Sequence, residues 1–389
     1  MSVTAVPGFV AAGIACGIKG DERPDLALVA TDDAQPVAAA ATFTSNKAKA
    51  APVLTSMAHL RATGGQAAAV VLNSGNANAA TGDSGRQHAE RTTELVATQL
   101  GCDAEHVLVC STGLIGIPLP IAPIEDGIKP LVNSLASDGG HRAAVAIMTT
   151  DTVPKQVVVE TDGGITVGGM AKGAAMLAPN MATMLAVLTT DAATDARTLG
   201  DALRRAVGRS FNILSVDGCT STNDTVIVLA NGRSNVTPTD DELTDALQKA
   251  CFSLAQQMAG DAEGSTHTIT IRVTGARNDD EAAIATRKVA ESQLVKCSFY
   301  GNDPYWGRIV SELGSAGVAF DPDDVTISYG GITVCDRGVA VEHDAAAVAA
   351  HMARRDVDVV ADLHLGDGES MILTNDLTHA YVDENMGTS

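Results

Sequence analysis

Hydrophobic and polar positions alternate along the chain with two periods, one typical of helices and one typical of strands. Segments expected as strands are 66–72, 106–110, 184–190 and 268–274, and segments expected as helices are 83–100, 124–135, 199–211 and 239–260. The last helix has the clearest ends, because Thr239 and Glu242 have the spacing of a capping box and Gly260 is a stop signal. The chain therefore mixes both kinds of element throughout.

Turns rich in glycine and small polar residues connect these elements. Hairpins are expected over 155–166, 325–334 and 357–373, with turns at 162–164, 330–331 and 366–368. A loop at 73–78 and a turn at 111–113 are expected to end the strands before them. Strands mixed with helices and many hairpins predict an α/β or α+β fold with layers around a mixed sheet.

Composition narrows the possible functions. The 389 residues are enough for about two or three ordinary domains or for one elaborate domain. The chain has 26 Lys+Arg, 47 Asp+Glu, a net charge of −21 and 3% aromatic residues. Such a surface repels phosphate backbones and anionic lipid and offers few stacking platforms, so neither nucleic acid nor a membrane is expected as a partner.

Cysteine and histidine usage indicates a cytoplasmic protein without a metal. The seven cysteines include no Cys-x-x-Cys pair, so free thiols in a reducing compartment are expected. No apolar run reaches the ~18 residues of a membrane span, and no signal peptide is expected. The nine histidines are not clustered with carboxylates, and no catalytic metal or cofactor is predicted.

A candidate nucleophile lies where a loop of glycine, alanine and proline residues leads into the strand expected at 184–190. There Thr183 follows Ala182, and by local pattern alone Thr183 is a strand-start residue. If the bond between them is cut, Thr183 carries a free α-amine beside its hydroxyl. With a pKa of about 8, that amine can act as the general base at neutral pH.

Nine short segments rich in Gly, Thr, Asn and Asp are spread over nearly the whole chain. They are 12–19 (AGIACGIK), 73–78 (NSGNAN), 110–116 (CSTGLIG), 147–155 (IMTTDTVPK), 172–185 (KGAAMLAPNMATML), 217–225 (DGCTSTNDT), 261–264 (DAEG), 303–308 (DPYWGR) and 374–378 (TNDLT). In content and order they resemble the bifunctional ornithine acetyltransferase/N-acetylglutamate synthase family of arginine biosynthesis. One departure is Tyr305, where that family usually has Asn.

The resemblance implies a fold, a processing step and a catalytic group. The fold is a layered αββα sandwich with a smaller α/β lobe. Self-cleavage between Ala182 and Thr183 gives an alpha chain of 1–182 and a beta chain of 183–389, which associate, with a heterotetramer of two of each expected. Thr183 is then the nucleophile, and the Thr112 hydroxyl and Gly113 N–H form the oxyanion hole. On local pattern, residues 111–113 are also an ordinary turn.

The resemblance also implies a substrate site. Its residues are Thr149, Lys172, Thr183, Glu263, Asn385 and the terminal Ser389. Lys172 can pair with a substrate carboxylate and Glu263 with the amine of ornithine; on local pattern they are a solvated loop lysine and a surface carboxylate at a helix end. The tail after Asn385 is one residue shorter than is usual in the family, so Thr388 is the alternative to Ser389.

The implied reaction moves the acetyl group of N2-acetyl-L-ornithine to L-glutamate through an acetyl-threonine intermediate. Some members also accept acetyl-CoA, and the sequence leaves that donor open. Two other interpretations remain at this point. One is an N-terminal-nucleophile amidohydrolase or aminopeptidase on a similar scaffold, which passes the acyl group to water. The other is a non-catalytic amino-acid-binding protein.

Overall fold

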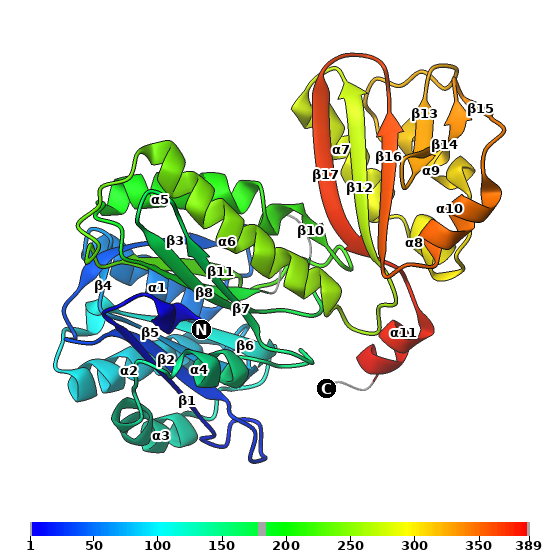
Figure 1. The fold of residues 1–389 in the computed structure, drawn as a ribbon. Helices are drawn as coiled ribbons and strands as arrows, with labels where there is room; N and C mark the ends of the chain where they lie inside the picture. The colour runs from blue at the N-terminus through cyan, green and yellow to red at the C-terminus, as the bar shows by residue number, and fades with distance from the viewer. Residues whose placement is uncertain (1, 178–183, 387–389) are drawn as a thin grey trace. The chain divides into compact units, whose positions relative to one another are not determined.

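A computed structural model describes residues 2–177 and 184–386 of the chain. It divides the chain into two compact units, which are described separately (Figure 1). Unit 1 comprises residues 1–212 and 219–258, and unit 2 comprises 213–218 and 259–389. The predicted cleavage after residue 182 would break a peptide bond within unit 1. It is therefore a different division from the one between the two compact units.

Unit 1 contains two mixed sheets. The four-stranded sheet has the order β1 (Phe9–Ile14), β2 (Leu26–Thr31), β5 (Ala69–Asn76) and β6 (Val107–Leu114), with only β5 and β6 parallel. The six-stranded sheet has the order β4 (Gln66–Ala67), β3 (Val37–Phe43), β11 (Thr225–Ala230), β9 (Leu185–Thr190), β8 (Thr166–Lys172) and β7 (Lys155–Glu160), with only β11 and β9 parallel.

Side chains that alternate along the strands show that the two sheets pack face to face. On β5, Val70 and Leu72 belong to a buried cluster that also contains Val187 of β9 in the other sheet. Their neighbours Ala69 and Val71 belong to a second cluster, on the outer face of the four-stranded sheet. That outer face is covered by helices α1 (Ala51–Ala62), α2 (Gly82–Leu100) and α3 (Ile121–Asn133), and α4 (Gly140–Ala146) packs against β1 and β2.

Two helices cover the outer face of the six-stranded sheet (Figure 1). They are α5 (Ala196–Gly208), which packs on β3, and α6 (Asp240–Gly260), whose Leu254 approaches Gly169 of β8. Gly169 leaves room for this contact because it has no side chain. The order helix, sheet, sheet, helix confirms the αββα sandwich that the resemblance implies.

Several local predictions are confirmed in unit 1, and two strand ends differ from them. The capping box of α6 forms, with the Thr239 N–H donating to Glu242 Oε2 at 2.8 Å and the Glu242 N–H donating to Thr239 Oγ1 at 3.3 Å. The expected loop at 73–78 and turn at 111–113 instead continue β5 to Asn76 and β6 to Leu114. The prediction of a turn at Thr112 and Gly113 is therefore wrong, because the two strands keep pairing there around a bulge.

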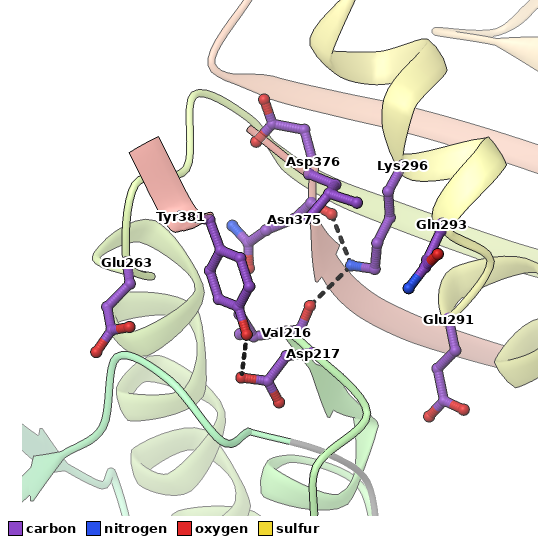
Figure 2. Close-up of a pocket in the computed structure, with 10 residues that line it drawn as sticks. Val216, Asp217, Glu263, Glu291, Gln293, Lys296, Asn375, Asp376 and Tyr381 are labelled. Atoms are coloured by element: carbon purple, nitrogen blue, oxygen red, sulfur yellow. Dashed lines mark hydrogen bonds between the residues drawn. The ribbon is translucent and has the colours of Figure 1, made fainter. Parts of the chain in front are cut away.

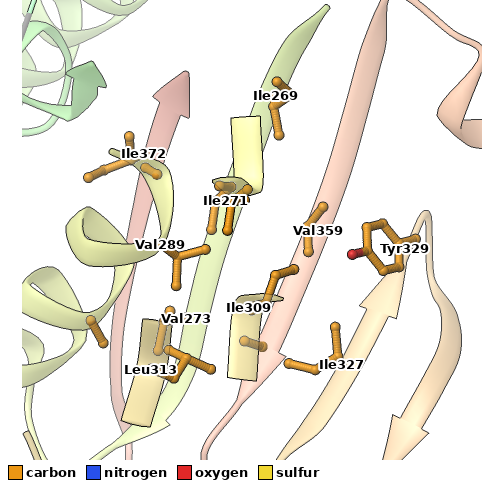
Figure 3. Close-up of a cluster of buried hydrophobic side chains, with 14 of the residues drawn as sticks. Ile269, Ile271, Val273, Val289, Ile309, Leu313, Ile327, Tyr329, Val359 and Ile372 are labelled. Carbon is orange, nitrogen blue, oxygen red and sulfur yellow. The ribbon is translucent and has the colours of Figure 1, made fainter. Parts of the chain in front are cut away.

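Unit 2 is built on one seven-stranded sheet. Its order is β10 (Leu214–Ser215), β17 (Gly368–Asn375), β12 (Thr268–Ala276), β16 (Asp356–Asp362), β13 (Thr326–Tyr329), β14 (Ile332–Asp336) and β15 (Val339–Ala340). Its helices are α7 (Asp279–Ala290), α8 (Gln293–Tyr300), α9 (Trp306–Gly314), α10 (Ala345–Met352) and α11 (His379–Asn385). Ile271 of β12, Val289 of α7 and Ile309 of α9 meet in its hydrophobic core (Figure 3).

The hairpin predicted over 325–334 is confirmed, but the one predicted over 357–373 is wrong. Strands β16 and β17 both form, yet β12 lies between them, parallel to β16 and antiparallel to β17. The glycine-rich connection crosses the end of β12, where the Leu363 N–H bonds to Thr274 O at 2.9 Å and the Gly366 N–H bonds to Gly275 O at 3.0 Å. Strand pattern and turn residues are the same for both arrangements, so the sequence does not distinguish them.

Candidate active site

The two predicted oxyanion-hole residues lie near the end of β6. Thr112 is buried, whereas Gly113 is exposed and has a φ of +134°, which favours glycine. A Cβ atom on Gly113 would overlap the backbone of Gly75 and Asn76 on the neighbouring strand. Beside them is a cleft of about 10 Å³, lined also by Met176. Thr112 and Gly113 therefore border a recess at the surface of unit 1.

Asp151 organises the other polar groups of this region. Its fully buried carboxylate lies 2.6 Å from Lys155 Nζ and 3.8 Å from Lys172 Nζ. It also accepts hydrogen bonds from the backbone N–H groups of Thr149, at 3.0 Å, and Gly173, at 2.7 Å. One carboxylate thus links the loop before β7 to the end of β8.

The charged state of Asp151 follows from these partners. Burial by itself would raise the pKa of this carboxyl, but the ammonium groups of Lys172 and Lys155 outweigh it and lower the pKa to about 2. Asp151 is therefore an anion at neutral pH. A buried anion between two lysines fixes the position of both side chains.

Lys172 connects this charged group to Thr112, one of the two predicted oxyanion-hole residues. Its ammonium lies 3.4 Å from Thr112 Oγ1 and is almost completely buried. A lysine ammonium only donates hydrogen bonds, so the Thr112 oxygen accepts and its own O–H can turn toward another acceptor. This arrangement suits a hydroxyl that donates to a developing oxyanion.

Two residues in the segment 217–225 also contribute to the site. Asn223 Nδ2 donates to Ser111 O at 2.9 Å and to Ala77 O at 2.6 Å, which joins the ends of β5 and β6 to the loop before β11. Asp224 is buried, and its Oδ1 accepts a hydrogen bond from the N–H of Met184 at 2.9 Å. Burial raises the pKa of Asp224 well above its usual range.

Unit 2 brings together two other predicted residues. The Asn385 side chain on α11 donates from Nδ2 to Glu263 Oε2 at 2.8 Å, and Glu263 is 9% exposed. Asn385 Nδ2 also reaches Tyr381 O at 2.9 Å, within the same helix. A carboxylate held by an amide in this way can still bind a cationic group.

The predicted residues therefore form two groups. In unit 1, Thr149 and Lys172 contact Asp151, and Lys172 also contacts Thr112, which precedes Gly113 on β6. In unit 2, Glu263 pairs with Asn385. Ala182, Thr183, Thr388 and Ser389 lie outside the described residues. Sequence reasoning missed Asp151 and Asp224, although both lie inside segments that carry the resemblance, 147–155 and 217–225.

Two further searches concern metals and membranes. Within residues 2–177 and 184–386, no group of three or more His, Cys, Asp or Glu side chains could hold a metal ion. In the same residues, every helix is too short or too polar to cross a membrane.

The fold and the polar site define a layered α/β protein with a pre-arranged cluster at the ends of β6 and β8. The chain belongs to the ArgJ family, which it matches over residues 10–387. Among its curated relatives, the arginine biosynthesis bifunctional protein of Mycolicibacterium paratuberculosis is 49% identical over 394 aligned positions and covers 100% of this chain and 96% of the relative. The protein of the same name from Streptomyces avermitilis is 49% identical, with 100% of both chains covered.

Similar chains also occur among solved structures. One is described as the ornithine acetyltransferase of Mycobacterium tuberculosis complexed with ornithine. It is 49% identical over 46% of this chain and 94% of that chain, with a TM-score of 0.44.

Proposed function

We propose that this chain is a self-cleaving glutamate N-acetyltransferase of arginine biosynthesis. It moves the acetyl group of N2-acetyl-L-ornithine to L-glutamate and yields L-ornithine and N-acetyl-L-glutamate. Membership of the ArgJ family supports acetyl transfer in this pathway, and the relatives that cover the whole chain carry the name arginine biosynthesis bifunctional protein. That name also supports a second activity, N-acetylglutamate synthesis from acetyl-CoA.

The observation that carries the proposal is the buried contact between Lys172 and Thr112 beside Asp151. Because Thr112 accepts from Lys172, its hydroxyl proton can donate to the oxygen of a tetrahedral intermediate. Gly113 adds its backbone N–H from the exposed end of β6. Loss of one such donor costs about 10²–10³ in kcat in other acyl-transfer enzymes.

The chemistry takes two steps on Thr183. After cleavage at Ala182, the Thr183 hydroxyl attacks the acetyl carbonyl while its α-amine takes the hydroxyl proton. The C–N bond of acetylornithine breaks, the proton passes to the leaving nitrogen, and ornithine departs. The amine of glutamate then attacks the acetyl ester, and its proton passes to the departing Thr183 oxygen. No cofactor is needed for either step.

Both substrates are amino acids, so one set of contacts can serve both. Lys172 binds the substrate carboxylate, with Thr149 held beside it through Asp151. Glu263, held by Asn385, binds the cationic amine of ornithine, and Ser389 completes the site. The chains 1–182 and 183–389 stay associated as a heterotetramer of two of each.

The test is a pair of substitutions at the nucleophile. Thr183→Ala is expected to give one uncleaved chain without acetyltransferase activity, whereas Thr183→Ser retains a hydroxyl and a following amine and should cleave at least in part. A denaturing gel counts the chains, and mass spectrometry of wild type incubated with acetylornithine alone should find one acetyl group on the peptide that begins at Thr183. Normal cleavage of Thr183→Ala, or no acetylated peptide, would exclude Thr183 as the nucleophile.

A further inference from the structure

The loop between β1 and β2 contains a lysine that the proposed function leaves without a role. This is Lys19, the last residue of the segment 12–19. The loop is held by the fully buried carboxylate of Asp25, which accepts hydrogen bonds from the N–H groups of Cys16 at 2.7 Å, Gly17 at 3.1 Å and Lys19 at 3.1 Å. One buried carboxylate thus fixes the backbone from which the Lys19 side chain extends.

The side chain of Lys19 lies beside residues of the candidate active site in unit 1. A Cβ atom on Gly75 of β5 would come within 3.0 Å of Lys19 Cγ, so glycine leaves room for the lysine stem. Gly75 pairs with Gly113, one of the two proposed oxyanion-hole residues. The Lys19 ammonium donates to Pro24 O at 2.7 Å and to Met148 O at 2.8 Å. These contacts fix the position of the ammonium group.

A short series of contacts connects Lys19 to Lys172. The oxygen of Met148 that accepts from Lys19 belongs to the same peptide group as the N–H of Thr149. That N–H donates to Asp151 Oδ2 at 3.0 Å, and the same oxygen lies 3.8 Å from Lys172 Nζ. One peptide group and one carboxylate oxygen therefore lie between the two ammonium groups. Thr149, a proposed substrate contact, is part of this series.

Lys19 keeps one hydrogen-bond donor for a ligand. An ammonium has three N–H donors, and the two carbonyl oxygens leave the third without a partner among the described residues. The Lys19 side chain is half-buried. Burial is the main cause that lowers its pKa, and the cationic groups of Arg23 and Lys172 act in the same direction. A bound anion would counteract these effects, so Lys19 is suited to bind a carboxylate.

The two substrates of the proposed reaction differ at the end of the side chain. N2-acetyl-L-ornithine ends in a cationic amine, which Glu263 is proposed to bind, whereas L-glutamate ends in a second carboxylate. Glu263 lines a cavity of unit 2 with three other carboxylates, those of Asp217, Glu291 and Asp376 (Figure 2). Like charges repel, so such a wall does not suit the side-chain carboxylate of glutamate. That carboxylate needs a cation elsewhere.

Other lysines at these sites are already engaged. Lys296 carries the only ammonium among the described residues that line the cavity. Its three N–H groups donate to three protein acceptors, which are Val216 O, Thr374 Oγ1 and Asn375 O. In unit 1, Lys155 is fully buried against Asp151, and Lys172 is proposed to bind the α-carboxylate. Lys19 is half-buried and has a donor left.

We propose that Lys19 binds the side-chain carboxylate of glutamate and so selects an acidic amino acid as the acetyl acceptor. The inference rests on the proposed function, in which Lys172 binds the α-carboxylate. Extended glutamate holds its two carboxylate carbons about 5 Å apart, and with a charge-assisted hydrogen bond of about 2.8 Å at each end it spans ammonium groups up to about 10 Å apart. Acetylornithine has no second carboxylate, so Lys19 distinguishes the two substrates.

The first test compares glutamate binding with and without the Lys19 charge, in the full chain and with no acetyl donor present. In calorimetric titrations, Lys19→Met should weaken the binding of L-glutamate about 10- to 100-fold, the range for a hydrogen bond between charged groups. Binding of L-glutamine, which has the same shape without the side-chain charge, should not change. As a matched control, Lys249→Met removes an exposed ammonium on α6 and should leave glutamate binding unchanged.

Kinetics separate a substrate contact from a structural role. In acetyl transfer, Lys19→Met should raise the KM for glutamate and leave the KM for acetylornithine at the wild-type value, and Lys19→Arg, which keeps the charge, should restore part of the loss. A lysine that only holds Met148 in place would, when replaced, displace Thr149 and raise both KM values. Circular dichroism checks folding, and Lys19→Gln, which keeps a hydrogen-bond donor, replaces Lys19→Met if that variant is unfolded.

Three results would overturn the inference. They are equal glutamate affinity in wild type and Lys19→Met, an equal loss for glutamate and glutamine, and an equal rise in both KM values. Each of them leaves the proposed function intact. Failure of the proposed function has a different signature, because wild type would then bind glutamate and transfer no acetyl group to it.

Discussion

Asp151 and Asp224 are two buried carboxyl groups of unit 1 with opposite surroundings. Asp151 lies against two lysine ammonium groups, which lower its pKa to about 2 despite burial. Asp224 has a backbone N–H on one oxygen, and burial raises its pKa well above the usual range. The first is held as an anion, and the fold disfavours the anion of the second.

These surroundings predict different costs for the same substitution. Asp151→Asn removes the charge that Lys155 and Lys172 face and should destabilise the fold by about 3 kcal/mol, as in other broken buried ion pairs. Asp224→Asn keeps an oxygen for the Met184 N–H and should cost about 1 kcal/mol or less. Urea unfolding of both variants measures the difference. Equal costs would show that Asp151 is not held as an anion.

Asp151 also predicts how stability changes in acid. Its pKa is about 2 in the fold against 3.8 ordinarily, so folding favours the ionised form. This contribution is present above pH 3.8 and is lost as the pH falls through 2. The gap in unfolding free energy between wild type and Asp151→Asn should therefore narrow by roughly 2 kcal/mol in that window. A gap that is constant from pH 6 to the acid limit of the fold would contradict the pKa shift.

The sequence predicted more of this site through motifs than through chemistry. Thr112, Thr149 and Lys172 were named because their segments resemble a family, and the structure gathers them. Asp151 was missed because it works through residues that the fold brings close, and local pattern does not report such contacts. The role of Thr183 remains a prediction.

At the scale of elements, the paired ends of β5 and β6 determine where the two proposed oxyanion-hole residues, Thr112 and Gly113, lie. The strands are parallel, and Asn76 pairs with both Thr112 and Leu114 around a bulge. Gly113 opposes Gly75, and the backbone of Gly75 and Asn76 leaves no room there for a Cβ atom on Gly113. This geometry exposes Gly113 while it keeps Thr112 buried.

A pair of glycine substitutions tests this close approach. Gly113 has a φ of +134° and no space for a Cβ, whereas Gly116 has a φ of +81° and nothing within 4 Å of the added atom. Both Gly→Ala changes cost about 1–2 kcal/mol of backbone strain, and Gly113→Ala should cost about 1–3 kcal/mol more from the clash. Chemical denaturation compares the two. Similar losses of unfolding free energy in the two variants would mean that the backbone of β5 moves aside for the Cβ atom of residue 113 without destabilising the fold.

Element type was easier to predict than element pairing. The capping box of α6 and the alternation of β12 depend on neighbours in sequence, and both were predicted correctly. The pairing of β16 and β17 was not, because β12 comes from about ninety residues earlier and inserts between them. The alternation of hydrophobic and polar residues determines which face of a strand is buried, but it does not determine which strands pair with it.

At the scale of the whole molecule, the six-stranded sheet mixes segments from both sides of residue 182. Strands β3 and β8 come from the proposed alpha chain, and β9 and β11 come from the proposed beta chain. Their order is β3, β11, β9, β8, so β9 pairs with β8 and β11 pairs with β3. A cut between β8 and β9 would leave every one of these ladders intact.

This order predicts that the cleaved chains stay together. After cleavage, the fragments 1–182 and 183–389 should co-elute in size-exclusion chromatography without denaturant and separate only when the sheet unfolds. Thr183→Ala, as an uncleaved control, should elute at the same position. Separation of the fragments in native buffer would contradict the shared sheet.

Because the six-stranded sheet contains strands from both proposed chains, cleavage would also change how this sheet re-forms after unfolding. In the intact chain, residues 173–184 tether β8 to β9, so the sheet can re-form within one molecule. Once that tether is cut, re-forming the sheet requires an encounter between two fragments, and its rate falls with dilution. If the chain is cleaved as proposed, the cut protein at low concentration persists only because it unfolds slowly, and its working life is set by the height of a kinetic barrier.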